Sequence, residues 1–184
     1  IINIEVYKEE LIGNEQSIQQ LYDLALRIEQ DYNAKGYPLV RAFLPTQELE
    51  PEQATVFIKV VDGYIEKLDL SKVPVSQIFR TYGYLRSLLK KKGLKLEEIE
   101  RKLLLAGNIA GMQLTSTLSP GENEGGTVLS ILASHKIISG AVTFDNTQSE
   151  ELGRQQGQIR AEVNSVLGLG ESISLFGLAR PTIK

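Results

Sequence analysis

The chain has 184 residues, of which 42% are hydrophobic and 23% are charged, the balance of a folded protein with one ordinary domain or two small ones. A net charge of −3 with both signs interspersed gives no reason to expect nucleic acid or an anionic membrane surface as a partner. Because there is no cysteine, a thiolate nucleophile, a cysteine-ligated metal site and a disulfide framework are excluded.

The first part of the chain is predicted to form one helix and two strands. Apolar side chains at helical spacing between Ile18 and Ile28 predict the helix, which Asn14 or Ser17 can cap and Gly36 ends. The predicted elements are a helix over residues 15–35 and strands over residues 37–44 and 55–61.

The second part is predicted to form a strand, two helices and two strands. Pro74 opens the first of these helices, and we expect Gly93 to close it. In the last strand, Leu129, Ile131 and Ala133 are the expected inward face. The predicted elements cover residues 64–70, 75–92, 96–106, 111–118 and 127–134.

These two parts look like a repeat. A helix ending in Gly36 precedes two strands, and a helix ending in Gly107 does the same about 70 residues later. A period this long predicts two tandem domains rather than a solenoid.

From residue 139 onward, polar and apolar residues alternate over three successive strands. Gln158, Arg160 and Glu162, for example, alternate with Ile159 and Ala161. In a soluble antiparallel sheet the apolar face would rest on other elements, whereas in a membrane β-barrel it would face lipid. The alternation by itself leaves both interpretations open.

No group of residues predicts catalysis. His135 is the only histidine, and no cysteine or second histidine can join it in a metal site. The sequence contains pairs of adjacent acidic residues, such as Glu97 and Glu98. The carboxylates of such neighbours do not converge on one substrate atom. The sequence therefore predicts a protein that is not an enzyme, with no metal and no cofactor.

Several segments, taken in order, resemble the outer-membrane transporters of two-partner secretion, the TpsB family. The resemblance begins with a helix that ends in a tyrosine-glycine step and leads into a strand closed by Leu44-Pro45-Thr46-Gln47. It continues through a strand that ends at Asp62-Gly63 and a proline-glycine hairpin. The segments that carry it are residues 32–47, 56–65, 103–127, 144–146, 152–154 and 164–172.

The resemblance implies an α+β fold with two tandem POTRA domains of β-α-α-β-β type, followed by antiparallel strands from the start of an outer-membrane β-barrel. The implied boundaries are residues 1–63, 64–137 and 138–184. The first domain lacks a clear opening strand and helix, so we expect residues 1–13 to be a truncated start. The implied location is the outer membrane of a Gram-negative-type bacterium, with the POTRA domains in the periplasm.

The family's function is to recognise the N-terminal secretion domain of a secreted exoprotein, the TpsA partner, and to deliver it to the barrel pore. An exposed strand edge can hold an unfolded polypeptide without a covalent reaction, because its unpaired N–H and C=O groups form hydrogen bonds with the polypeptide's backbone. The strand after the second helix of each POTRA domain is the expected edge. The side chains predicted to contact the exoprotein are Leu39, Arg41 and Phe43 in the first domain and Gln113, Thr115 and Thr117 in the second.

Two other functions fit the same sequence. POTRA domains also occur in machines that insert outer-membrane proteins, although two domains before a barrel favour secretion. Alternatively, the chain is a soluble adaptor whose last strands complete its own sheet. If residues 139–180 are barrel strands, their unpaired edges and apolar face predict self-association of this chain.

Overall fold

The computed structural model describes residues 7, 13, 17–47, 55–146 and 156–179, and over these residues the protein is α+β with three separate sheets. The α+β class expected from the sequence is confirmed. The chain folds into two compact units. Unit 1 contains residues 1–69, 85–102 and 117–130, and unit 2 contains residues 70–84, 103–116 and 131–184.

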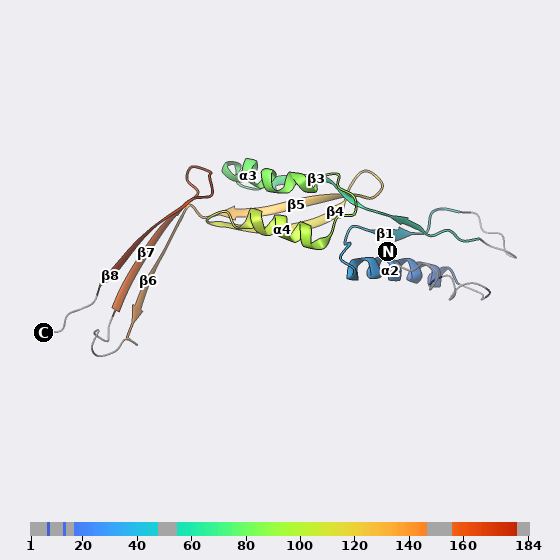
Figure 1. Cartoon of the computed structure of the whole chain (residues 1–184), viewed down its shortest axis with the longest axis horizontal. Coiled ribbons are helices and arrows are strands. Elements are labelled where there is room, and N and C mark those ends of the chain that lie inside the picture. Colours follow the sequence, from blue (N-terminus) through green and yellow to red (C-terminus); the bar gives the residue numbers. More distant parts are fainter. Residues whose placement is uncertain (1–6, 8–12, 14–16, 48–54, 147–155, 180–184) are drawn as a thin grey trace. The chain divides into compact units, whose positions relative to one another are not determined.

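The first helix described, α2 (Ile18–Ala34), belongs to unit 1 (Figure 1). Ser17 caps it through a capping box, in which the Ser17 hydroxyl accepts from the Gln20 amide and the Gln20 side chain accepts from the Ser17 amide. Gly36 follows the helix at φ 84°, a left-handed conformation that glycine adopts without steric cost. The predicted helix and one of its two predicted caps are therefore confirmed.

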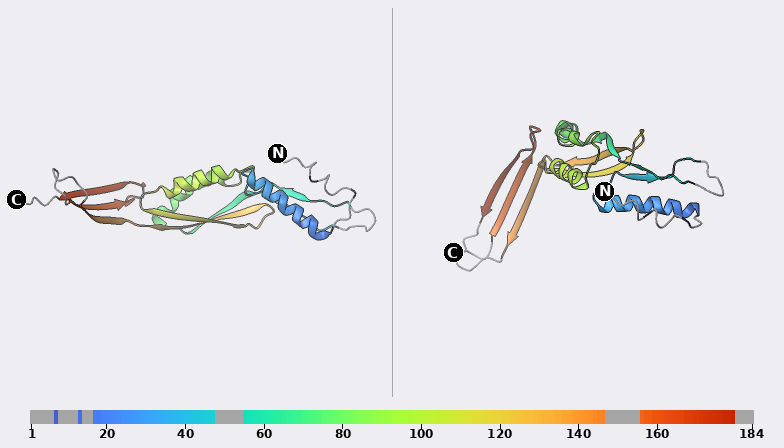
Figure 2. Two further views of the ribbon diagram at one scale, coloured as in Figure 1. Left: turned by 90° about the horizontal axis from the view of Figure 1, so that it is seen from below. Right: turned by 45° about the vertical axis from the view of Figure 1, so that its right-hand side comes forward.

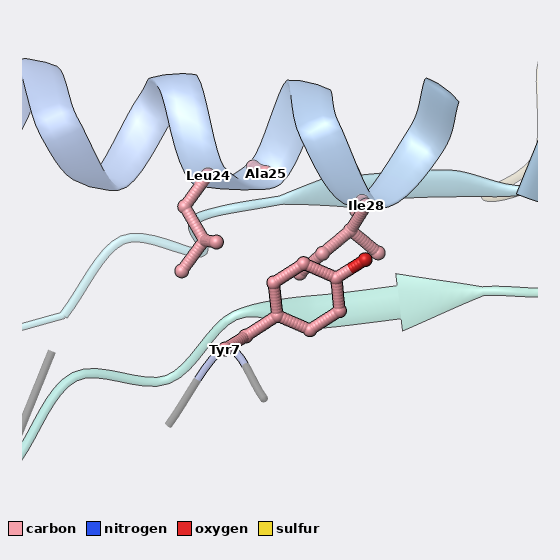
Figure 3. Close-up of a cluster of buried hydrophobic side chains, with 5 residues drawn as sticks. Tyr7, Leu24, Ala25 and Ile28 are labelled. Carbon is pink, nitrogen blue, oxygen red and sulfur yellow. The ribbon is translucent and has the colours of Figure 1, made fainter. Parts of the chain in front are cut away.

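Strands β1 (Arg41–Phe43) and β2 (Lys59–Val61) form a two-stranded antiparallel sheet beside α2. Between them lies a cluster of buried side chains, of which Tyr7, Leu24, Ala25 and Ile28 are shown in Figure 3. Ala42 of β1 completes this cluster. The Tyr7 hydroxyl also donates to the Asp31 carboxylate, which ties Tyr7 to the helix.

Residues 64–135 show the order strand, helix, helix, strand, strand that the sequence predicts. The strands pair in the order β3–β5–β4, so β5 is central and both other strands are edges. The elements are β3 (Tyr64–Lys72), α3 (Val75–Leu85), the 3₁₀ turn η1 (Arg86–Leu88), α4 (Leu96–Gly107), β4 (Met112–Pro120) and β5 (Gly126–His135).

These elements bury apolar side chains of their own. Leu129 and Ile131 are each 1% exposed, which confirms two of the three residues predicted for the inward face of β5. Ile65, Leu85 and Leu88 are fully buried. Burying side chains of this size stabilises the fold by about 1.5–3 kcal/mol each.

Strands β6 (Ile138–Asp145), β7 (Gln156–Asn164) and β8 (Ser172–Ala179) form the third sheet, antiparallel throughout. In both views of Figure 2 these strands lie side by side with no described helix of unit 2 over them. Three antiparallel strands in this region confirm the pattern predicted from residue 139 onward.

Three predicted elements are shorter in the structure than expected. The strand predicted over residues 55–61 covers only Lys59–Val61. The helix predicted over residues 75–92 ends at Leu85 and continues only as a 3₁₀ turn to Leu88. The Lys90 amide instead donates to the Ile65 carbonyl, which draws the chain out of the helix. The strand predicted over residues 37–44 covers only residues 41–43, because a turn occupies residues 38–39.

Two of the expected segments fall mainly outside the described residues. The truncated start at residues 1–13 falls largely outside the described residues, as does the segment at residues 152–154. The predicted domain boundaries stay a prediction. None of the described helices combines the length and the apolar character needed to cross a membrane.

Candidate functional site

Strand β4 is an edge of its sheet and carries three of the predicted contact residues. Gln113, Thr115 and Thr117 are exposed, and they alternate with the half-buried Leu114 and Ser116. One row of side chains on this edge strand is therefore open to solvent over much of its nine-residue length. An open edge of this length can accept an additional strand.

The hairpin that follows β4 is fixed by one carboxylate of β3. Glu66 Oε2 accepts from the amides of Glu122 and Asn123 at 3.1 and 3.2 Å, and Glu66 Oε1 accepts from Asn123 Nδ2 at 2.6 Å. A Cβ atom on Gly126 would lie 2.0 Å from Glu66 Oε2 and 2.9 Å from the Asn123 carbonyl oxygen, so a larger residue there would displace the Glu66 carboxylate. Glu66 thus holds the chain where the β4 edge ends.

The opposite edge strand, β3, is closed at its start. The Lys90 amide donates to the Ile65 carbonyl at 2.8 Å, and Leu89 forms a parallel bridge with Ile65. The Lys92 ammonium lies 4.4 Å from the centre of the Tyr64 ring. The β3 edge is therefore already paired at Ile65, whereas the β4 edge keeps its row of exposed side chains.

In unit 1, β1 carries Arg41 and Phe43 as exposed residues on one face, and Ala42 points into the core. The Lys59 ammonium lies 6.0 Å from the centre of the Phe43 ring. Leu39 differs from the expectation, because it lies in the turn before β1 and its side chain is 2% exposed. Its placement on an exposed strand face with Arg41 and Phe43 is therefore wrong.

The third sheet separates polar from apolar side chains by face. Its register aligns Val142 of β6 with Ile159 of β7, and Ala161 of β7 with Leu175 of β8. Val142, Ile159 and Leu175 are 64%, 58% and 76% exposed. The residues that share this face are Ile138, Gly140, Val142, Phe144, Gly157, Ile159, Ala161, Val163, Ile173, Leu175, Gly177 and Ala179.

The opposite face of this sheet is mainly polar. It carries Ser139, Thr143, Gln158, Arg160 and Glu162, although Phe176 and Leu178 of β8 also lie there. Arg160 and Glu162 form an ion pair along this face. The third sheet therefore has one continuous apolar face, which no described helix of its unit covers, and one mainly polar face.

Within unit 2, α3 contacts the turn between β7 and β8. Gln77, which is fully buried, donates to the Ser165 hydroxyl at 3.2 Å, and Arg80 donates to the Gly168 carbonyl at 3.0 Å. In that turn, the Leu167 amide hydrogen bond is the main cause that holds the pKa of Glu171 below its usual value. These contacts fix the turn to the helix.

The sequence did not predict the roles of Gln77 and Ser165. Gln77 and Thr81 are polar residues four apart on the buried side of α3, while Val75 and Phe79 are 87% and 90% exposed. The spacing of four between Gln77 and Thr81 places them on one face of a helix and could have been noticed in the sequence. Nothing in the sequence identifies Ser165 as the partner of Gln77. Glu66 left no local pattern either, because its partners are more than 50 residues away.

His135, the single histidine, contacts the backbone of a neighbouring segment. His135 Nε2 lies 3.1 Å from the Ala110 carbonyl oxygen, a contact within the fold. Among the residues that the structure describes, no three histidine, aspartate or glutamate side chains come together as metal ligands.

Over most of its length the chain is similar in sequence to curated outer-membrane transporters. Residues 4–63 match the family described as "POTRA domain, ShlB-type". The chain is 28% identical to the heme/hemopexin transporter protein HuxB of Haemophilus influenzae (strain 86-028NP), an alignment that covers 94% of this chain and 32% of HuxB. It is 27% identical to the outer membrane transporter CdiB of Dickeya dadantii (strain 3937), over 89% of this chain and 27% of CdiB.

Among solved structures, CdiB from Escherichia coli is similar with a TM-score of 0.66 and 21% identity, over 97% of this chain and 33% of CdiB. This likeness shows the fold. The chain spans about a third of the length of these relatives. The resemblance to two-partner-secretion transporters and the presence of a POTRA domain are thus confirmed.

Proposed function

We propose that this chain, which contains a ShlB-type POTRA domain and is related to two-partner-secretion transporters, recognises an unfolded exoprotein in the periplasm and delivers it to an outer-membrane β-barrel. The exoprotein's N-terminal secretion domain pairs as an added strand with the POTRA edges. The single observation that carries this proposal is the open edge of β4, with Gln113, Thr115 and Thr117 exposed along it.

Strand addition suits a substrate that arrives unfolded. The backbone hydrogen bonds form with nearly any sequence and contribute about 0.5–1.5 kcal/mol each, so several together hold a segment without fixing its side chains. The exposed row on β4 then adds selectivity, since threonine and glutamine side chains hydrogen-bond and accept small residues opposite. In β1, Arg41 and Phe43 take the same role, and Leu39 belongs to the core.

The third sheet is the start of the barrel in this proposal. Its apolar face would contact the hydrocarbon of the outer membrane, and the face with Arg160 and Glu162 would line the lumen. In a soluble adaptor, an apolar face this large would be covered, whereas Val142, Ile159 and Leu175 are exposed over the residues that the structure describes. The same uncovered face and free edges underlie the expected self-association.

The proposed function includes no catalysed reaction. The relatives are transporters, and the chain handles a polypeptide through backbone pairing.

An NMR titration tests the proposal. The probe is a short peptide in which threonine and valine alternate, and the control peptide has the same composition with a central proline, which cannot donate to a strand edge. We expect saturable chemical-shift changes at residues 112–118 with the first peptide only.

A matched pair of variants locates the binding. Thr115→Ala should weaken the response, whereas Thr143→Ala, an exposed threonine of β6, should leave it unchanged. If residues 112–118 do not respond, or if both peptides act alike, strand addition at β4 is wrong.

A further inference from the structure

The edge of β1 differs from that of β4 in one hydrogen bond. The Ala42 amide donates to Glu29 Oε1 of α2 at 2.8 Å. Ala42 lies opposite Val60 in the antiparallel register, and in such pairs alternate residues direct their backbone groups away from the partner strand. Its N–H therefore points toward the free edge of β1, where an added strand would place a carbonyl oxygen.

This free edge has few other donors. β1 has three residues, and the preceding amide, that of Val40, is directed to the Tyr37 carbonyl in a turn. Glu29 thus occupies the central donor of the strand, and its carboxylate is a stronger acceptor than a peptide carbonyl because it is charged.

Glu29 also has a second partner at hand. Arg41 Nη1 lies 3.8 Å from Glu29 Oε2, and the Arg41 side chain is 52% exposed while that of Glu29 is 19% exposed. When the carboxylate leaves the Ala42 amide, the guanidinium can hold it with direct hydrogen bonds. The displaced charge then stays paired at the edge.

We propose that Glu29 closes the β1 edge, and that an exoprotein strand pairs with β1 only after the Glu29 carboxylate has moved from the Ala42 amide to Arg41. This inference rests on the proposed function. It makes β4 the edge that is open at first contact and β1 an edge that opens on demand. A strand that binds β1 replaces one hydrogen bond with another, so binding there is weak unless neighbouring contacts favour it.

The test uses the full chain and two readouts. Amide hydrogen exchange of Ala42, measured without any peptide, reports whether Glu29 holds this N–H. Titration with the alternating threonine-valine peptide reports binding through the resonances of Arg41, Ala42 and Phe43. The variants are Glu29→Ala and, as a control that removes an acidic group from the same helix, Asp23→Ala, whose carboxylate accepts from Gln19.

In Glu29→Ala we expect Ala42 to exchange at least about tenfold faster, and the peptide to bind β1 at least about tenfold more tightly, the factor expected for losing one charge-assisted acceptor. Asp23→Ala should match the wild-type chain in both readouts. Glu29→Gln keeps a neutral acceptor and should give intermediate values, so the test holds even where the alanine variant fails to fold.

The outcomes separate the two proposals. An unchanged Ala42 exchange rate, or equal peptide binding at β1 in wild type and Glu29→Ala, overturns the closure even when β4 binds the peptide. If β4 and β1 both fail to respond in every variant, the proposed function itself fails. Faster exchange with weaker peptide binding would make Glu29 a support of β1 and would also overturn the closure.

Discussion

Placing a lysine on each face of β6 tests whether the third sheet meets lipid. Val142 is 64% exposed on the apolar face, opposite Ile159, and its neighbour Thr143 lies on the polar face, opposite Gln158. Val142→Lys and Thr143→Lys add the same charge one residue apart. Only the first puts this charge on the apolar side.

The expected difference follows from the cost of a charge in hydrocarbon. A lysine on the lipid face of a membrane barrel costs about 2–4 kcal/mol at the midplane and less toward the interfaces. Since about 1.4 kcal/mol corresponds to tenfold, Val142→Lys should weaken membrane association by about tenfold to several hundredfold. The larger values apply if residue 142 reaches the bilayer centre.

The assay is sedimentation of the full chain with phosphatidylcholine vesicles. These lipids carry no net charge, so the added lysines gain no electrostatic attraction. We expect the wild-type chain and Thr143→Lys to bind alike and Val142→Lys to remain in the supernatant. Equal loss in both variants, or no vesicle binding by the wild-type chain, would refute the assignment of this face to lipid.

Three more predictions concern the contacts that support the edges and the turn. Thr81 is fully buried and, among the described residues, its hydroxyl has no hydrogen-bond partner, so Thr81→Val should raise the free energy of unfolding by about 1–2 kcal/mol in urea titrations, and a loss of stability would show that the hydroxyl is paired. Glu66→Ala removes three acceptor contacts and should lower stability by about 1 kcal/mol and speed amide exchange at Asn123, and unchanged exchange there would contradict its anchoring role. The folded pKa of Glu171 lies below its usual value of 4.5, so the stability that its hydrogen bonds contribute is present above pH 4.5 and is lost as the pH falls through the folded pKa. The amide resonance of Leu167, which donates to this carboxylate, should shift over the same pH range. A Leu167 resonance that stays fixed would refute this link.

Local patterns predicted the helices and strands well where neighbours in sequence decide them. The cap at Ser17 and the apolar stripe of α2 are contained within one helix, and both are confirmed. The helix predicted to reach Lys92 ended early because a distant residue, Ile65, accepts the Lys90 amide. No periodicity within the helix itself could reveal that contact.

The candidate site was predictable in part for the same reason. Alternation in β4 placed Gln113, Thr115 and Thr117 on one row, since side chains of a strand alternate by construction. Leu39 was misplaced because a turn interrupts the alternation before β1, and the burial of its side chain depends on the surrounding chain.

By itself, the sequence determined the order of elements, the second strand-helix-helix-strand-strand unit and the two faces of the third sheet, because spacing along the chain encodes each of them. Only the tertiary structure decided which strand edges are free. Glu29 holds the Ala42 amide across 13 residues of chain, and the Lys90 amide meets the Ile65 carbonyl across a helix. A backbone N–H looks the same in every residue of a sequence, so whether it is available depends on what the fold brings to it.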